Sequence, residues 1–159
     1  MVESGYKKVY NQIVNLKRGK YMFFGEYSHA LDEKGRIRIP SKLKAGLGEY
    51  VATKGVDNCI YIFSKSYFET EFLESVSKVS AYSLNGQNAV RAILSSTFEI
   101  EEDNQGRFTI PTSLKEFAGI TKNVVSIGVG NRIEIWDEQA WKEYNNKTSF
   151  VDAIKDLNS

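Results

Sequence analysis

The sequence has only one cysteine, one histidine and two prolines among its 159 residues. A single cysteine, Cys59, cannot form a disulfide within the chain, which fits a reducing, cytoplasmic setting. Catalysis by a Ser-His-Asp or Cys-His arrangement would have to use His29, which we expect to lie in a strand. No apolar run approaches the roughly 20 residues of a membrane span. We therefore predict neither a membrane protein nor an enzyme.

Motifs that hold cofactors are also absent from the sequence. There is no zinc-ligand spacing, no phosphate-binding loop and no dinucleotide fingerprint, so we predict no catalytic residue, no metal and no cofactor. The acidic residues at Glu99 and 101–103 are best explained by a solvated strand face. Because the net charge is only +1, a nucleic-acid site would have to be a local basic patch.

The main feature of the sequence is a repeated motif. DEKGRIRIP at 32–40 returns 71 residues later as DNQGRFTIP at 103–111, and both copies follow the pattern Asp-x-x-Gly-Arg-apolar-x-Ile-Pro. Six of the nine positions are identical or similar at one fixed shift, which indicates a duplicated unit. With 42% apolar residues, the chain can build a core as one domain or two small ones.

Each copy predicts a hairpin, a break and a short helix. In the first copy, the turn at 32–35 follows an extended stretch at 27–31, and Gly35 can adopt a positive φ. Residues 36–39 alternate, so Ile37 and Ile39 share one face while Arg36 and Arg38 share the other. In the first copy we expect Pro40 to end the strand and Ser41 to cap a short helix that runs through Leu47. In the second copy we expect a turn at Gly106 and a strand with Phe108 and Ile110 facing inward. Pro111 then ends this strand and Thr112 caps the next helix.

Similarity between the two halves continues beyond the motif. Residues 51–63 match residues 124–136 at an offset of 73, and an aromatic residue closes both segments. We expect strands at 50–54 and 59–63, then a helix capped by Ser64 that runs to about Ser77. A linker at 80–85 leads to a second helix at about 87–95, with Val90, Ile93 and Leu94 facing inward. The predicted repeats span residues 26–68 and 97–140.

The two ends of the chain differ from the repeats. Residues 1–21 carry five basic residues against Glu3 alone, so the rest of the chain is net acidic. They either form a basic arm that contacts DNA phosphates or lie upstream of a natural start at Met22, which we favour. We expect residues 147–159 to be a thin polar tail, apart from Phe150, Val151 and Ile154, that frays or docks on a neighbour.

Five blocks, in this order and spacing, resemble the MraZ family of bacterial regulators: MFFGEY, DEKGRIRIP, GVDNCIYIF, DNQGRFTIP and GVGNRIEIW. The resemblance extends from about Met22 to Tyr144. It implies an α+β fold, namely a duplicated AbrB-like swapped-hairpin β-barrel with flanking helices. It also implies sequence-specific binding of double-stranded DNA at promoter-proximal repeats, control of the division and cell-wall gene cluster, and assembly of subunits into a ring. Such a protein would be cytoplasmic and nucleoid-associated.

The family motif Asp-x-x-x-Arg marks the candidate site. Arginine can bond two acceptors on guanine and lysine can contact phosphate, so the predicted DNA-binding residues are Lys34, Arg36, Arg38 and Lys42. The alternative for Asp-x-x-x-Arg is an ion pair across the turn that fixes the loop. We favour this alternative for both aspartates and for the second arginine, which has acidic neighbours. The predicted turn-structural residues are Asp32, Gly35, Asp103, Gly106 and Arg107.

Two functional classes explain the duplication. A DNA-binding regulator also explains the basic first hairpin, whereas a structural ring-forming protein without specific DNA binding does not explain Arg36 and Arg38. Two non-identical faces on a duplicated barrel favour head-to-tail contacts and a closed ring. A ring engages several hairpins at once, so we expect an operator of short direct repeats, near one helical turn apart, upstream of the protein's own operon.

Overall fold

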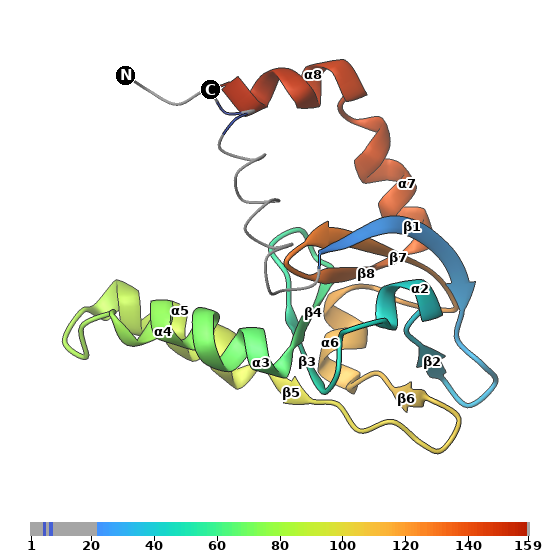
Figure 1. Ribbon diagram of the computed structural model, residues 1–159, viewed down its shortest axis with the longest axis horizontal. Helices are drawn as coiled ribbons and strands as arrows, with labels where there is room; N and C mark the ends of the chain where they lie inside the picture. The colour runs from blue at the N-terminus through green and yellow to red at the C-terminus, as the bar shows by residue number, and fades with distance from the viewer. Residues whose placement is uncertain (1–4, 6, 8–21, 159) are drawn as a thin grey trace.

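The computed structural model describes residues 5, 7 and 22–158, so the predictions made for residues 1–21 lie, apart from Gly5 and Lys7, outside the described residues (Figure 1). The strands are β1 (Phe23–Ala30), β2 (Arg36–Arg38), β3 (Tyr50–Lys54), β4 (Ile60–Ser64), β5 (Phe98–Glu99), β6 (Arg107–Thr109), β7 (Asn123–Gly130) and β8 (Ile133–Asp137). The helices are α2 (Ser41–Lys44), α3 (Lys65–Tyr67), π-helical η1 (Phe68–Phe72), α4 (Leu73–Ser77), α5 (Leu84–Ser95), α6 (Thr112–Phe117), α7 (Glu138–Asn146), α8 (Phe150–Lys155) and 3₁₀-helical η2 (Asp156–Asn158).

The strands form two antiparallel sheets. The larger has six strands in the order β1-β7-β8-β4-β3-β5, and the smaller pairs β2 with β6. Helices accompany these sheets, which confirms the α+β class. Within residues 22–158 the larger sheet ends at β1 and β5 and no closed barrel is found, so the barrel stays a prediction.

The first two strands of each repeat pair with strands of the other repeat, whereas the last two strands of each repeat form a hairpin. β1 pairs along its whole length with β7, from Phe23 opposite Gly130 to Ala30 opposite Asn123, and β2 pairs with β6. The hairpin expected between β1 and β2 is therefore wrong. Only the turn itself is closed locally, by the N–H of Asp32 donating to the carbonyl of Arg36 at 2.9 Å. β2 instead buries its inward face against the equivalent strand of the other repeat.

One hydrophobic core serves both repeats. Ile37 and Phe108 lie opposite each other in the β2–β6 pair, and both are buried, which confirms their predicted inward direction. Ile39 and Ile110 are buried as well. The short helices contribute the equivalent residues Leu43 and Leu114, which are almost completely buried. The two Asp-x-x-x-Arg turns are thus fixed to a shared, well-packed base.

The caps of the short helices differ from the prediction. Ser41 and Thr112 are the first helical residues, and neither side chain caps its helix. Pro40 and Pro111 take the N-cap position instead, with a φ of −50° and a ψ near 135°. The predicted caps are wrong because each proline already supplies the non-helical backbone and the first hydrogen-bond acceptor of its helix. The Pro40 carbonyl accepts the N–H groups of residues 43 and 44, and the Pro111 carbonyl accepts those of residues 114 and 115.

Helices α3, η1, α4 and α5 form an arm that extends from the sheet (Figure 1). Its start is as predicted, since the Ser64 hydroxyl accepts the N–H of Tyr67 at 3.1 Å, although the middle of the first helix is π-helical. The second helix begins at Leu84, earlier than predicted, because the Ser83 hydroxyl accepts the N–H of Gly86. Leu94 is 41% exposed, so its expected inward direction is wrong.

At the C-terminal end, α7 packs on the sheet and α8 extends away from it (Figure 1). The Trp141 indole donates to Glu26 of β1 at 2.7 Å, which fixes α7 against the edge strand. The segment predicted as a polar tail contains α8, whose Phe150 is 79% exposed. Whether it docks on a neighbour stays a prediction. No helix within residues 22–158 combines the length and apolarity needed to cross a bilayer.

Candidate nucleic-acid interface

The first turn is braced by its own aspartate. Oδ1 of Asp32 accepts the backbone N–H groups of Lys34 at 2.9 Å and Arg36 at 2.8 Å, and Oδ2 accepts Nε of Arg36 at 2.7 Å. Gly35 has a φ of 73°, in the left-handed region that favours glycine. The pKa of Asp32 lies below its ordinary value, chiefly because the carboxylate accepts the backbone N–H of Arg36. The Arg36 guanidinium and the backbone N–H of Lys34 lower it further. The carboxylate therefore stays ionised and keeps the turn closed at neutral pH.

The second turn repeats this arrangement. Oδ1 of Asp103 accepts the N–H groups of Gln105 and Arg107, each at 2.9 Å, and Oδ2 accepts Nε of Arg107 at 2.8 Å. Gly106 has a φ of 76°. These donors lower the pKa of Asp103 to about 2, the backbone N–H of Arg107 having the largest effect. Arg36 and Arg107 consequently pair with their turn aspartates in the same way. The sequence favours DNA contact for Arg36 and an ion pair within the turn for Arg107, and this pairing does not distinguish the two roles.

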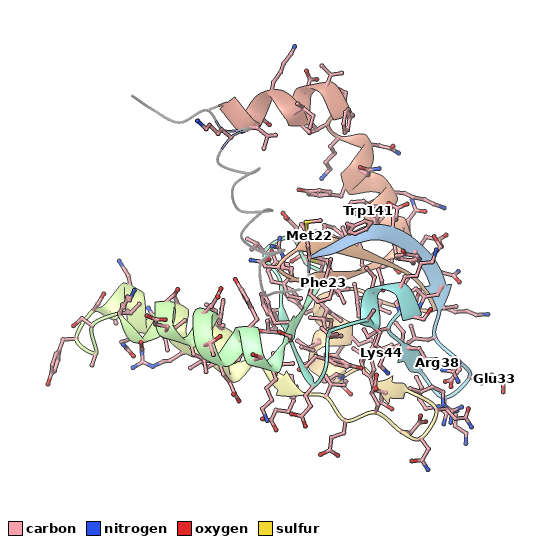
Figure 2. All side chains as sticks on the ribbon, viewed as in Figure 1. Met22, Phe23, Glu33, Arg38, Lys44 and Trp141 are labelled. Carbon is pink, nitrogen blue, oxygen red and sulfur yellow. The ribbon has the colours of Figure 1, made fainter. Side chains whose placement is uncertain are left out.

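Pairing of β2 with β6 brings the two turns together at one end of the molecule (Figure 1). Arg36 Nη1 lies 3.9 Å from Oδ2 of Asp103 in the other turn. Arg38 lies opposite Arg107 and donates from Nη2 to Oε1 of Gln105 at 3.4 Å. Residues 32–38 and 103–109 thus form a continuous surface, which we call the two-turn surface. Figure 2 shows Arg38, Glu33 and Lys44 at this end of the molecule.

The four predicted DNA-binding residues lie at different positions around the two turns. Lys34 and Arg36 belong to the first turn, whereas Arg38 reaches the second, and Lys42 lies on α2. Lys34, Arg38 and Lys42 are exposed. The side chains of Arg36 and Arg107 are about one-quarter exposed, at 26% and 25%. In the described part of the chain, neither the Lys34 nor the Lys42 ammonium has a hydrogen bond or ion pair.

Two further lysines lie beside the first turn. Lys115 and Lys122, from the second repeat, line an open groove of about 620 Å³ together with residues 31–33, Gly35 and Thr121. Neither lysine belongs to the repeated motif or to the residues predicted to bind DNA. A signal was present for Lys115, which follows Pro111 by the same four positions that separate Lys44 from Pro40. Without the strand pairing, however, nothing in the sequence places either lysine next to the first turn.

The one histidine and the one cysteine of the sequence are partly and fully buried, respectively. His29 Nε2 lies 2.7 Å from the Ser126 hydroxyl, and burial lowers the pKa of this histidine. Cys59 is fully buried, and burial raises the pKa of its thiol to about 12. Among residues 5, 7 and 22–158, no three His, Cys, Asp or Glu side chains gather where they could hold a metal ion. Arginine and lysine at the two-turn surface are thus the groups best placed to bind a ligand, which would be anionic.

Comparison with known proteins identifies the family of the chain. A family model described as "MraZ protein, putative antitoxin-like" matches residues 22–83 and 93–156. The chain belongs to the MraZ family. It is 47% identical over 137 residues to a protein of Clostridium beijerinckii named "Transcriptional regulator MraZ", covering 84% of this chain and 94% of that one. It is 43% identical over 140 residues to a protein of the same name from Syntrophomonas wolfei, covering 86% and 96%.

The ranges matched by the MraZ model contain all the strands of residues 22–158 and both turns. The break between the two ranges falls within α5, in the helical arm. The similarity to the family model therefore covers both sheets, the two-turn surface and the helices of residues 22–158, apart from residues 84–92 of α5 and the last residues of η2.

Proposed function

We propose that this MraZ-family protein is a sequence-specific, DNA-binding transcriptional regulator that contacts double-stranded DNA through the two-turn surface. The observation that carries the proposal is the pair of adjacent Asp-x-x-x-Arg turns, in each of which the turn's own aspartate holds the arginine side chain by Nε. The curated relatives are named transcriptional regulators, which supports the same function. The β2–β6 pairing between repeats also fits the swapped-hairpin arrangement that we expect of this family.

The chemistry of the turns suits recognition of DNA. Because Asp32 and Asp103 bind Nε, the guanidinium groups of Arg36 and Arg107 are oriented before DNA arrives. Their Nη groups can then donate to acceptors on guanine or phosphate, and Arg36 Nη1 also lies 3.9 Å from Oδ2 of Asp103. Each aspartate is neutralised by its own arginine, which reduces its repulsion of phosphate. Arg38 is exposed and offers a further guanidinium, while the ammonium groups of Lys34 and Lys42 suit phosphates.

We propose further that the protein acts as a ring-shaped homo-oligomer on several short direct repeats upstream of its own operon, within the division and cell-wall gene cluster. One two-turn surface covers only a short stretch of DNA, so several must bind together, each raising the effective concentration of the next. Exposed apolar side chains at Phe24, Phe150 and Val151 are available for contacts between subunits. This function places the protein in the cytoplasm, on the nucleoid.

A binding experiment tests the proposal. The full-length protein is titrated with its own upstream DNA and with a scrambled fragment of equal length and composition, at two salt concentrations. We expect tighter binding to the upstream DNA and a steep loss with salt, about one log unit per log of salt for each phosphate contact. The double variant Lys34→Ala/Arg38→Ala should lose binding without a change in melting temperature, because both side chains are exposed.

The same titration distinguishes the alternative function. A protein that forms a ring by light scattering but binds both fragments equally weakly would be a structural ring-forming protein, and the regulator proposal would be wrong. Deleting one repeat from the upstream DNA should weaken binding far more than one base change does. Equal affinity for one isolated repeat and for the full array would refute the multivalent arrangement.

A further inference from the structure

The groove beside the first turn has an equivalent position beside the second, and the two carry different charges. Lys115 beside the first turn corresponds to Lys44 in the other repeat, at the offset of 71 residues. At the same offset, Leu31 corresponds to Glu102. Lys122 corresponds to Glu49, at the offset of 73 that relates the later strands. At these three pairs of corresponding positions, the first turn is accompanied by two lysines and a leucine, whereas the other set consists of one lysine and two glutamates.

Beside the second turn, the lysine is neutralised. Lys44 Nζ lies 2.5 Å from Oε1 of Glu102, and the hydroxyl of Tyr50 donates to Oε2 of the same carboxylate at 2.7 Å. Tyr50 is only 3% exposed and packs edge-on against Phe108, so Glu102 is bound to a rigid part of the core. Because Glu102 is fixed in this way, the charge of Lys44 is satisfied within the protein.

Beside the first turn, no carboxylate takes this place. Leu31 is buried in the core, and in the described residues neither the Lys115 nor the Lys122 side chain has a hydrogen bond or ion pair. The acids that line the groove are Asp32, which is held by Arg36, and Glu33, which is exposed. Lys122 is anchored next to the turn by its backbone, since its carbonyl accepts the N–H of Leu31 at 2.9 Å.

We infer that Lys115 and Lys122 extend the DNA-binding surface past the first turn, where each contacts a backbone phosphate, and that no equivalent extension exists past the second turn. This inference rests on the proposed function. A DNA duplex that lies across both turns continues over the groove on the side of Lys115 and Lys122, while on the other side it meets the bound Lys44–Glu102 pair. The two ends of each bound DNA segment are thereby held unequally.

The experiment compares Lys115→Ala/Lys122→Ala with the wild type, using the full-length protein and the upstream and scrambled DNA fragments. Loss of two phosphate contacts should lower the slope of log affinity against log salt by about 2 per engaged subunit. Affinity should fall by the same factor on both fragments, because phosphates carry no sequence information. Melting temperature and particle mass should not change. Since Lys115 is partly buried, Lys115→Gln/Lys122→Gln keeps more of its apolar stem and should behave alike.

A charge-matched control separates local contact from overall charge. Lys78→Ala/Lys142→Ala removes one positive charge from the residue that caps the C-terminus of α4 and one from α7. Both helices lie away from the two-turn surface (Figure 1), so the salt slope should be unchanged. Two outcomes would overturn the inference and leave the proposed function standing. One is an equal loss of salt slope in the control. The other is a wild-type slope in both Lys115/Lys122 variants while Lys34→Ala/Arg38→Ala loses binding. If Lys34→Ala/Arg38→Ala also binds like the wild type, the proposed function itself fails.

Discussion

Arg36 and Arg107 make the same contacts within their turns but have different surroundings, so replacing each by alanine separates bracing of the turn from contact with DNA. After either substitution, the turn aspartate still accepts two backbone N–H groups. The turns should therefore keep their shape. We expect a small and similar decrease in melting temperature for both variants, because partly exposed ion pairs contribute little to stability.

DNA affinity should respond unequally to the two substitutions. A bidentate contact between arginine and a base contributes about 1–3 kcal/mol, or roughly 5–150-fold in affinity, and we expect Arg36→Ala to lose this amount per engaged subunit. The Nη groups of Arg36 can make such a contact, although Nη1 also lies 3.9 Å from Oδ2 of Asp103. The turn of Arg36 adjoins Lys115 and Lys122. Arg107 lies near an acidic run and near Lys44, which is neutralised by Glu102. Replacing Arg107 by alanine should therefore lower DNA affinity by less than about fivefold.

Arg36→Lys provides a sharper test of what the guanidinium does. Lysine keeps the charge but not the planar fork, so this variant should keep its affinity for scrambled DNA and lose most of its preference for the upstream repeats. Fluorescence anisotropy on both fragments, with melting temperature and light scattering as checks on fold and assembly, measures each quantity. Equal losses for Arg36→Ala and Arg107→Ala, with unchanged melting, would show that both turns contact DNA alike and would refute the asymmetry.

Three further predictions concern stability and assembly. The pKa of Asp103 is about 2, below its ordinary 3.8, so its ionised form stabilises the fold above about pH 4, and this contribution is lost as the pH falls toward 2. Asp103→Asn should consequently show a shallower decline of melting temperature over that range than the wild type; equal declines would contradict this linkage. Phe108→Ala removes a buried ring that contacts Tyr50 and should lower the free energy of unfolding, measured by denaturant titration, by about 3–5 kcal/mol. A decrease of less than about 1 kcal/mol would contradict this prediction. Phe150→Asp, at a side chain 79% exposed, should reduce particle mass in light scattering without lowering the melting temperature, and unchanged mass would exclude Phe150 from the subunit contact.

Local features of the fold could be predicted because they depend on residues close in sequence. The alternation of residues 36–39 correctly indicated which side chains face the core, and Ser64 and Asp137 both cap helices. Strand partners could not be predicted in this way. β2 has only three residues, and its alternation is satisfied equally by β1 or by β6. The choice of β6 depends on the joint burial of Ile37 and Phe108, which are 71 residues apart.

The candidate site was predictable to the same extent. The motif identified both turns and suggested the ion pair that Asp32 and Arg36 form. It did not indicate that Arg38 reaches the second turn, because that position follows from the antiparallel register opposite Arg107. Nor did it indicate Lys115 and Lys122, whose place beside the first turn depends on the two repeats being interleaved.

Fusion of two repeats in one chain has a consequence for DNA recognition. Two copies of a single-repeat chain would present identical turns, and any charge placed beside one would appear beside the other. Here the equivalent positions Leu31 and Glu102 have diverged, so one lysine is left unpaired and the other is bound. A surface with unequal sides has a direction along the duplex. Subunits arranged head to tail would repeat that direction from one to the next, which favours direct over inverted repeats as their binding sites.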